Sequence, residues 1–133
     1  MSESRVVVLD ASVGVKWIRS EGGSAEAYAL LEEHRQRRCR IVVPAHFIHE
    51  VVAVATRHAG ADGGRRVWDL LRDSELTVVQ LDDAMAGRAF DVCAELGCTF
   101  YDGLAPALAR ICGGTLYSAD RRAHGSFEGV VLL

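Results

Sequence analysis

A run of four aliphatic residues, Val6-Val7-Val8-Leu9, ends directly in Asp10 near the start of the chain. Three of the four are β-branched, which favours a short strand that is fully buried. Asp10 is therefore expected at the carboxyl end of a strand, the edge at which open α/β sheets bind ligands. The alternative is that Asp10 or Ser12 only caps the helix that follows.

Short apolar runs recur along the chain, and segments with helical spacing separate them. The further strands are expected at residues 41–43, 76–79, 115–118 and 130–132. The helices are expected at 13–19, after an N-cap at Ser24, from Pro44 to Gly60, after Asp62, from Asp82 and Asp83 to Gly97, and from Thr99 or Asp102 to Ile111. This alternation predicts an α/β fold, a three-layer α/β/α sandwich whose central sheet is mainly parallel and has about five strands. We expect residues 1–133 to form a single domain.

The composition supports a folded domain and excludes several classes of protein. Half of the 133 residues are hydrophobic and only two are proline, so the chain can bury a proper core. No apolar run approaches the ~20 residues of a membrane span, and residues 1–5 lack the features of a secretory signal. We therefore expect a cytoplasmic protein. The formal net charge of −3 argues against a broad basic surface for nucleic acid, but not against a nuclease whose acidic site is neutralised by metal ions.

The four cysteines agree with a reducing compartment. They form no C-x-x-C pair and have no histidine at zinc-finger spacing, so we expect reduced, partly buried thiols and no structural zinc site. They are Cys39, Cys93, Cys98 and Cys112.

Four carboxylates lie where a predicted strand ends or a predicted helix begins: Asp10, Glu50, Asp102 and Asp120. If the strands are neighbours, all four can converge on one crevice. Carboxylates a few ångströms apart raise one another's pKa, and bound divalent cations remove that repulsion. Mg²⁺ and Mn²⁺ prefer carboxylate and water oxygens, and can present a water to a phosphodiester. This chemistry needs no histidine, and none of the five histidines is placed so as to demand a role.

Each acid also has a purely structural interpretation. Asp102 can belong to a capping arrangement with Thr99, and Asp120 can cap a short final helix. Ser118 can orient a carboxylate or a water, or only end a strand. Glu50 is harder to interpret as a surface residue because it lies among apolar residues.

Four ordered motifs resemble those of the PIN-domain ribonucleases, and most closely the VapC-type toxins of bacterial toxin–antitoxin pairs. The motifs occupy residues 8–17, 44–51, 100–109 and 116–122, so the resemblance covers essentially the whole chain. It implies a metal-dependent endoribonuclease that cleaves RNA phosphodiester bonds. It also implies a homodimer that a cognate antitoxin protein holds inactive.

The same resemblance implies roles for individual residues. Asp10, Glu50, Asp102 and Asp120 would be the catalytic residues and the ligands of Mg²⁺ or Mn²⁺, with Ser118 supporting the site. The third motif departs from the family pattern at Gly103 and Pro106, and the second lacks the asparagine that often follows the glutamate. Pro106 is expected close enough to the first helical turn to be tolerated.

Two other functions fit part of this pattern. A phosphohydrolase of the haloacid dehalogenase type also places an aspartate after the first strand, but it needs a second aspartate where this chain has Ser12. A PIN-fold binding module would keep the fold and its dimer surface without turnover. The presence of all four acids favours the nuclease over this module.

Overall fold

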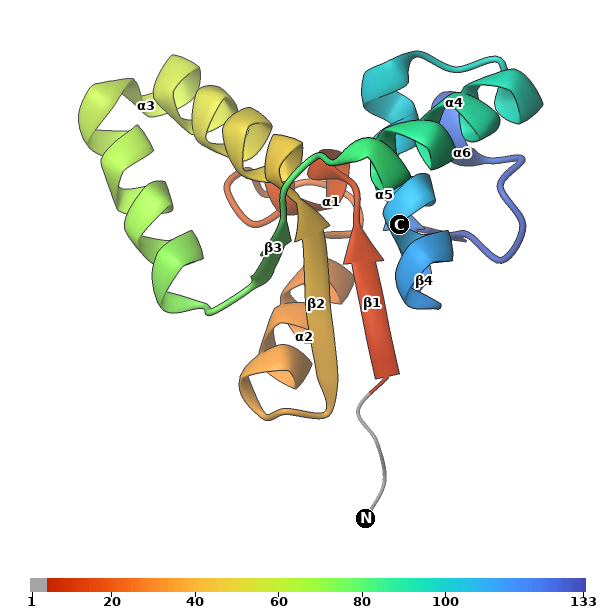
Figure 1. Cartoon of the computed structure of the whole chain (residues 1–133). Coiled ribbons are helices and arrows are strands. Elements are labelled where there is room, and N and C mark those ends of the chain that lie inside the picture. Colours follow the sequence, from red (N-terminus) through yellow and green to blue (C-terminus); the bar gives the residue numbers. More distant parts are fainter. Residues whose placement is uncertain (1–4) are drawn as a thin grey trace.

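Five parallel strands form the centre of the fold, with helices on both faces (Figure 1). The structure is a computed structural model that describes residues 5–133, so the segment 1–4, on which the absence of a secretory signal was predicted, lies outside the described residues. The strands are β1 (Arg5–Leu9), β2 (Cys39–Pro44), β3 (Thr77–Val79), β4 (Thr115–Ser118) and β5 (Val131–Leu132). The helices are α1 (Ala11–Val15), α2 (Ser24–Arg35), α3 (Ala45–Asp73), α4 (Asp83–Leu96), α5 (Phe100–Cys112) and α6 (Arg121–His124).

The strand order is β3-β2-β1-β4-β5, and every neighbouring pair is parallel. β1 therefore lies in the middle, with β2 on one side and β4 on the other. The predicted three-layer α/β sandwich with a parallel sheet is confirmed. This order brings the carboxyl ends of β1 and β4 side by side. Asp10 follows β1 directly, and Asp120 follows β4 after one intervening residue.

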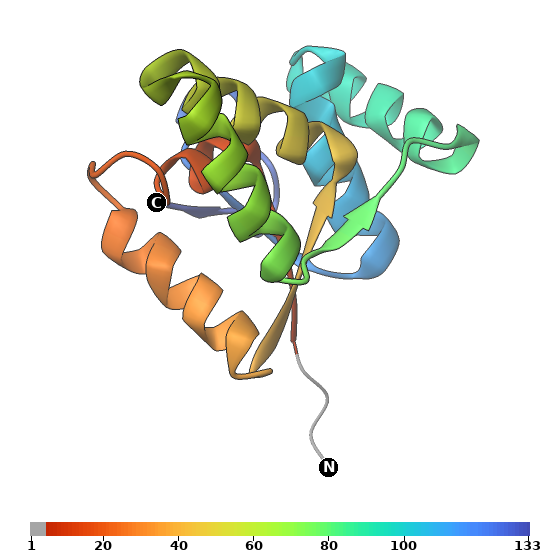
Figure 2. The same ribbon diagram turned by 90° about the vertical axis from the view of Figure 1, so that its left-hand side faces the viewer.

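Alternate side chains of the central strands fill two separate cores, as expected for a sheet covered on both faces. Val7 and Leu9 of β1 pack on the face that carries α1, α2 and α3. Val8 of the same strand packs on the other face, beneath α4 and α5. Figure 2 shows the view turned by 90°, in which α2 and α3 lie on the near face of the sheet.

α3 is bent into two arms, which are visible in Figure 1 as the yellow and light-green helical segments. The break lies at Ala59 and Gly60, and Gly60 has a φ of 72°. Glycine adopts this left-handed backbone without steric cost, so the predicted helix end at Gly60 is confirmed. The second arm turns back at an angle to the first and leads into the edge strand β3.

The first helical segment differs from its prediction. α1 begins at Ala11, two residues before the predicted start, because Asp10 caps it, and it ends at Val15. The next turns are held by the buried Lys16, whose ammonium contacts Glu21 at 3.2 Å and also donates to the Gly22 carbonyl. The helix predicted over 13–19 is therefore shorter than expected, and a fixed loop follows it.

The predicted N-cap at Ser24 is also wrong by one residue. Gly23 is the N-cap of α2, with a φ of 87°, and Ser24 is the first helical residue. The Ser24 hydroxyl instead accepts from the Glu21 amide at 3.0 Å and donates to the Lys16 carbonyl at 3.0 Å. The serine thus closes the loop before the helix.

No helix within residues 5–133 is long and apolar enough to span a membrane.

Candidate active site

Asp10 leaves the carboxyl end of β1 and caps α1 at the same time. Its Oδ2 accepts hydrogen bonds from the Ser12 amide at 3.1 Å and from the Ser12 hydroxyl at 2.6 Å. Its own amide donates to the carbonyl of Tyr117 in β4 at 3.0 Å. Within residues 5–133, Oδ1 accepts no hydrogen bond, so this half-buried carboxylate keeps one oxygen for a ligand. The capping interpretation is confirmed, and it leaves the carboxylate able to bind.

Ser12 connects the ends of the two central strands. Its hydroxyl donates to Asp10 and accepts from the Ala119 amide at 2.9 Å. Ala119 immediately precedes Asp120, so this one hydroxyl ties the Asp10 carboxylate to the backbone that carries Asp120. From the sequence, the structural role expected of Ser12 is that of a helix cap, and its bond to Ala119 is not predicted.

Asp120 and Ser118 form a second local network, after β4. Asp120 Oδ1 accepts from the Ala123 amide at 3.0 Å and so caps the short helix α6, as one interpretation predicted. The Asp120 amide donates to the Ser118 hydroxyl at 3.0 Å. Ser118 is fully buried, and its hydroxyl lies 2.7 Å from Nδ1 of His124. Ser118 therefore does more than end a strand, because it holds the backbone at Asp120.

Asp102 lies in the first turn of α5. Thr99 caps this helix, accepting from the Asp102 amide at 3.1 Å, so the predicted capping arrangement is confirmed. Asp102 and Asp120 line one small cavity of about 190 Å³, together with Cys98 and Arg122. Burial, together with smaller effects of Cys93 and Asp102, raises the pKa of the Cys98 thiol to about 11. This thiol is therefore protonated at neutral pH and is a weak nucleophile.

Two expectations about this region are wrong. Pro106 is the seventh residue of α5 and is buried, so it lies beyond the first turn. His124, which the sequence analysis gave no role, is fully buried and contacts both halves of the site. Its Nε2 lies 2.6 Å from the Asp102 carbonyl oxygen, and its Nδ1 faces Ser118.

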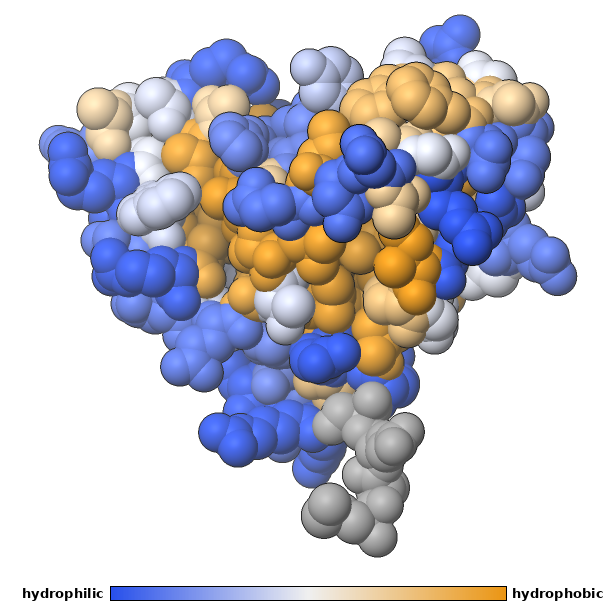
Figure 3. Space-filling model, in the orientation of Figure 1, coloured by the Kyte–Doolittle hydropathy of each residue, from blue (hydrophilic) through white to orange (hydrophobic). Residues whose placement is uncertain are grey.

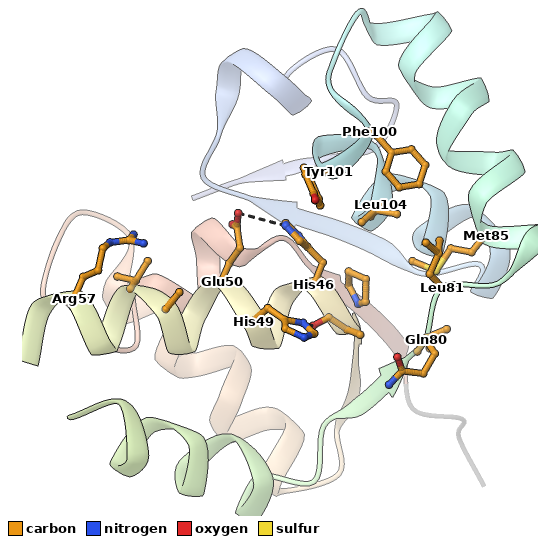
Figure 4. A pocket seen from close by; sticks show the side chains of 15 residues that line it. His46, His49, Glu50, Arg57, Gln80, Leu81, Met85, Phe100, Tyr101 and Leu104 are labelled. Carbon is orange, nitrogen blue, oxygen red and sulfur yellow. Dashed lines mark hydrogen bonds and ion pairs between the residues drawn. The ribbon is translucent and has the colours of Figure 1, made fainter. Parts of the chain in front are cut away.

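Glu50 lies apart from the three aspartates, on the first arm of α3. Its side chain is 55% exposed and pairs with His46, one helical turn earlier, at 3.4 Å. It lines a different cavity, of about 820 Å³, which also includes Tyr101 and Arg57 (Figure 4). The His46 ring stacks on Tyr101 with ring centres 4.6 Å apart, and Tyr101 precedes Asp102 in the chain. The contacts of His46 therefore link Glu50 to Tyr101, the residue before Asp102.

The donor chemistry of this region fits a hard divalent cation, because every candidate ligand is a carboxylate. The arrangement is looser than the predicted quartet. Among residues 5–133 no group of three or more His, Cys, Asp or Glu side chains is close enough to hold a metal ion. Asp10 and Asp120 follow neighbouring strands, Asp102 shares a cavity with Asp120, and Glu50 lines another cavity. The four acids as metal ligands stay a prediction.

All four cysteines are free thiols, as predicted. Cys39 is buried and the other three are half-buried.

Comparison with known proteins identifies the fold. The chain resembles a toxin–antitoxin complex from Klebsiella pneumoniae (15% identity, TM-score 0.71, covering 94% of this chain and 95% of that one). It also resembles VapC20 of Mycobacterium tuberculosis, a toxin that cleaves the sarcin–ricin loop (15% identity, TM-score 0.72, 93% and 98%). A third match is the DNA-bound VapBC of Salmonella typhimurium (16% identity, TM-score 0.72, 97% and 97%).

No curated protein sequence matches the chain with significant similarity. At such identities the solved structures establish a shared fold. A family model described as the PIN domain matches residues 7–126, which is most of the chain. This protein therefore belongs to the PIN domain family.

Proposed function

We propose that this protein is a metal-dependent endoribonuclease that acts as the toxin of a toxin–antitoxin pair. The observation that carries the proposal is the placement of Asp10 and Asp120 at the ends of neighbouring strands, joined through the Ser12 hydroxyl, with Asp102 lining the same cavity as Asp120. Parallel sheets bind ligands at this edge. Membership of the PIN domain family supports a nuclease.

In this proposal Asp10, Asp102 and Asp120 hold Mg²⁺ or Mn²⁺, and Glu50 completes the acidic set. A bound ion would activate a water and stabilise the charge that develops on the phosphate oxygens. Ser12 and Ser118 keep the carboxylates at the strand ends by the hydrogen bonds described above. Arg122 lines the same cavity as Asp102 and Asp120, and its guanidinium would bind the phosphate of an RNA backbone.

An antitoxin partner is the second part of the proposal. Figure 3 shows apolar side chains gathered across the centre of one face, between α3 and the α4–α5 pair. Leu81 and Tyr101, which are 54% and 63% exposed, line the cavity next to Glu50. A segment covering this surface would also cover an acid of the site. Two of the similar structures are complexes of a toxin with its antitoxin, and the proposed toxin would be a homodimer like those that the motifs resemble.

The test is cleavage of a labelled total-RNA pool by the purified protein. Cleavage is measured with Mg²⁺, with Mn²⁺ and with a chelator, beside the variant Asp10→Asn. Asparagine still offers an oxygen to the Ser12 amide, so this variant keeps the helix cap and loses only the charge. We expect discrete fragments that require both the metal and Asp10.

The matched control is Asp82→Asn, which makes the same chemical change at the N-cap of α4. Asp82 Oδ1 accepts from the Met85 amide at 2.8 Å, and it lines neither cavity described above. This variant should cleave RNA like the unaltered protein. Unchanged cleavage by Asp10→Asn would refute the metal site, and equal loss in both variants would point to a folding defect.

One observation favours a second candidate function, a PIN-fold binding module without turnover. Within residues 5–133 the acids form no ready cluster for an ion, and Glu50 is engaged by His46. Calorimetric titration with Mn²⁺ separates the two functions. Binding that depends on Asp10 supports the nuclease, whereas no binding at all supports the binding module.

A further inference from the structure

Pro106 leaves one carbonyl of α5 without its helical donor. In an α-helix the amide of each residue donates to the carbonyl four residues earlier, and proline has no amide hydrogen. The carbonyl that Pro106 cannot reach belongs to Asp102. The turn before it is intact, because the Gly103 amide donates to the Thr99 carbonyl at 3.0 Å. The missing hydrogen bond therefore falls on the candidate metal ligand itself.

His124 occupies the place of that donor. Its Nε2 lies 2.6 Å from the Asp102 carbonyl oxygen, although the two residues belong to different elements, α6 and α5. A carbonyl can only accept, so Nε2 carries the hydrogen and donates. His124 is fully buried, where an unmade hydrogen bond is costly, so it supplies what Pro106 lacks.

The other ring nitrogen of His124 extends this connection to Asp120. Nδ1 lies 2.7 Å from the Ser118 hydroxyl, and that hydroxyl accepts from the Asp120 amide. With the hydrogen on Nε2, the neutral ring accepts from Ser118 at Nδ1, and every group in the chain is satisfied. The directed chain runs from the Asp120 amide through Ser118 and His124 to the Asp102 carbonyl.

We propose that His124 is a positioning residue that fixes the first turn of α5 against the segment after β4, and so sets Asp102 relative to Asp120. It does so by replacing the backbone hydrogen bond that Pro106 removes. This structural link between the two segments does not depend on whether the protein binds a metal. Its consequence for metal binding rests on the proposed function.

The test is a double-mutant cycle on the full chain, with His124→Phe, Pro106→Ala and the double variant. Phenylalanine fills the buried volume of the imidazole but cannot donate. Alanine at position 106 restores an amide that can donate to the Asp102 carbonyl, so the loss of His124 should then matter much less. His124→Gln is the conservative control, because its amide can donate to Asp102 and accept from Ser118.

Two readouts are made on each variant. The first, without metal or RNA, is the hydrogen exchange of the amides in the first turn of α5, together with the nitrogen NMR spectrum of His124. We expect the neutral form with hydrogen on Nε2, faster exchange in His124→Phe, and near-normal exchange in the double variant and in His124→Gln.

The second readout is the Mn²⁺ dissociation constant from calorimetry. Outer hydrogen-bond partners of metal ligands typically change affinity roughly 10- to 100-fold, and we expect a loss of that size in His124→Phe. The double variant should regain most of it. Equal losses in His124→Phe and in the double variant, in both readouts, would overturn the proposal and leave His124 a packing residue. If the unaltered protein binds no Mn²⁺, the proposed function fails, while the exchange cycle still decides whether His124 replaces the missing donor.

Discussion

Replacing Ser12 by alanine tests whether one hydroxyl holds the two strand ends of the site together. The Ser12 hydroxyl makes two hydrogen bonds, a charge-assisted one of 2.6 Å to Asp10 and a neutral one of 2.9 Å from the Ala119 amide. Typical net values are about 1.5–3 kcal/mol for a bond to a charged group and about 1 kcal/mol for a neutral one. Ser12 is half-buried, and water can replace part of both bonds. We therefore expect Ser12→Ala to lower the free energy of unfolding by about 2 kcal/mol.

The effect on the proposed site follows from the same two bonds. Without the hydroxyl, Asp10 keeps only the bond from the amide of residue 12, and the backbone before Asp120 loses its link to β1. We expect the Mn²⁺ dissociation constant to rise roughly 10-fold or more.

Urea unfolding and calorimetric titration measure the two quantities. Ser12→Thr keeps the hydroxyl and should retain most of both properties. Ser126→Ala makes the same change at an exposed serine whose hydroxyl forms no hydrogen bond within residues 5–133, and it should alter neither. A Ser12→Ala protein that unfolds and binds Mn²⁺ like Ser126→Ala would refute the reasoning.

Two further predictions concern stability. A Cβ on Gly14 would lie 2.6 Å from Cζ of Phe47, so Gly14→Ala should lower the free energy of unfolding by about 1–2 kcal/mol, since overpacking outweighs the gain in helix propensity. At Gly87 nothing lies within 4 Å of a new Cβ, so Gly87→Ala should raise the free energy of unfolding, measured with urea, by about 0.5–1 kcal/mol. Equal effects of the two substitutions would contradict this reasoning. The hydrogen bonds from Arg110 hold the pKa of Glu95 below its ordinary value of 4.5. A lowered pKa stabilises the fold above the unfolded pKa and ceases to do so as the pH falls through the folded one. Glu95→Gln should therefore be less stable than the unaltered protein at pH 7 and equal to it in strong acid, and a difference that persists in acid would contradict this.

The fold could be predicted from the sequence because its signals are local. Four aliphatic residues before Asp10 describe a strand buried on both faces, and the structure places them alternately in the two cores. The break at Gly60 and the Thr99 cap also depend only on near neighbours in the chain. The order of the strands is different, because it depends on which surfaces pack together. The hydrogen bond from the Ala119 amide to the Ser12 hydroxyl connects residues 107 positions apart in the sequence, and no local pattern around either residue indicates it.

The position of Glu50 shows a second limit of reasoning from strand ends. The rule that strands point their carboxyl ends at one edge applies to residues next to a strand. Glu50 lies more than a helical turn into α3, so its direction depends on the rotation of that helix. The pairing of Glu50 with His46 could have been predicted from the sequence, because residues four apart on a helix are neighbours. The sequence also contains a reason to look for a residue such as His124. A proline inside a predicted helix leaves one backbone carbonyl without its helical donor, so a donor from elsewhere in the chain is expected.

Capping and metal binding are not competing roles for the aspartates of this site. Asp10 uses Oδ2 and Asp120 uses Oδ1 to accept backbone amides, so each carboxylate is held in one orientation while its second oxygen makes no hydrogen bond within residues 5–133. A carboxylate already fixed by its cap loses less side-chain entropy when it binds an ion. The structural role therefore favours the proposed chemical one. It also makes the charge separable from the cap, because asparagine at position 10 can keep the cap while it removes the charge on which metal binding would depend.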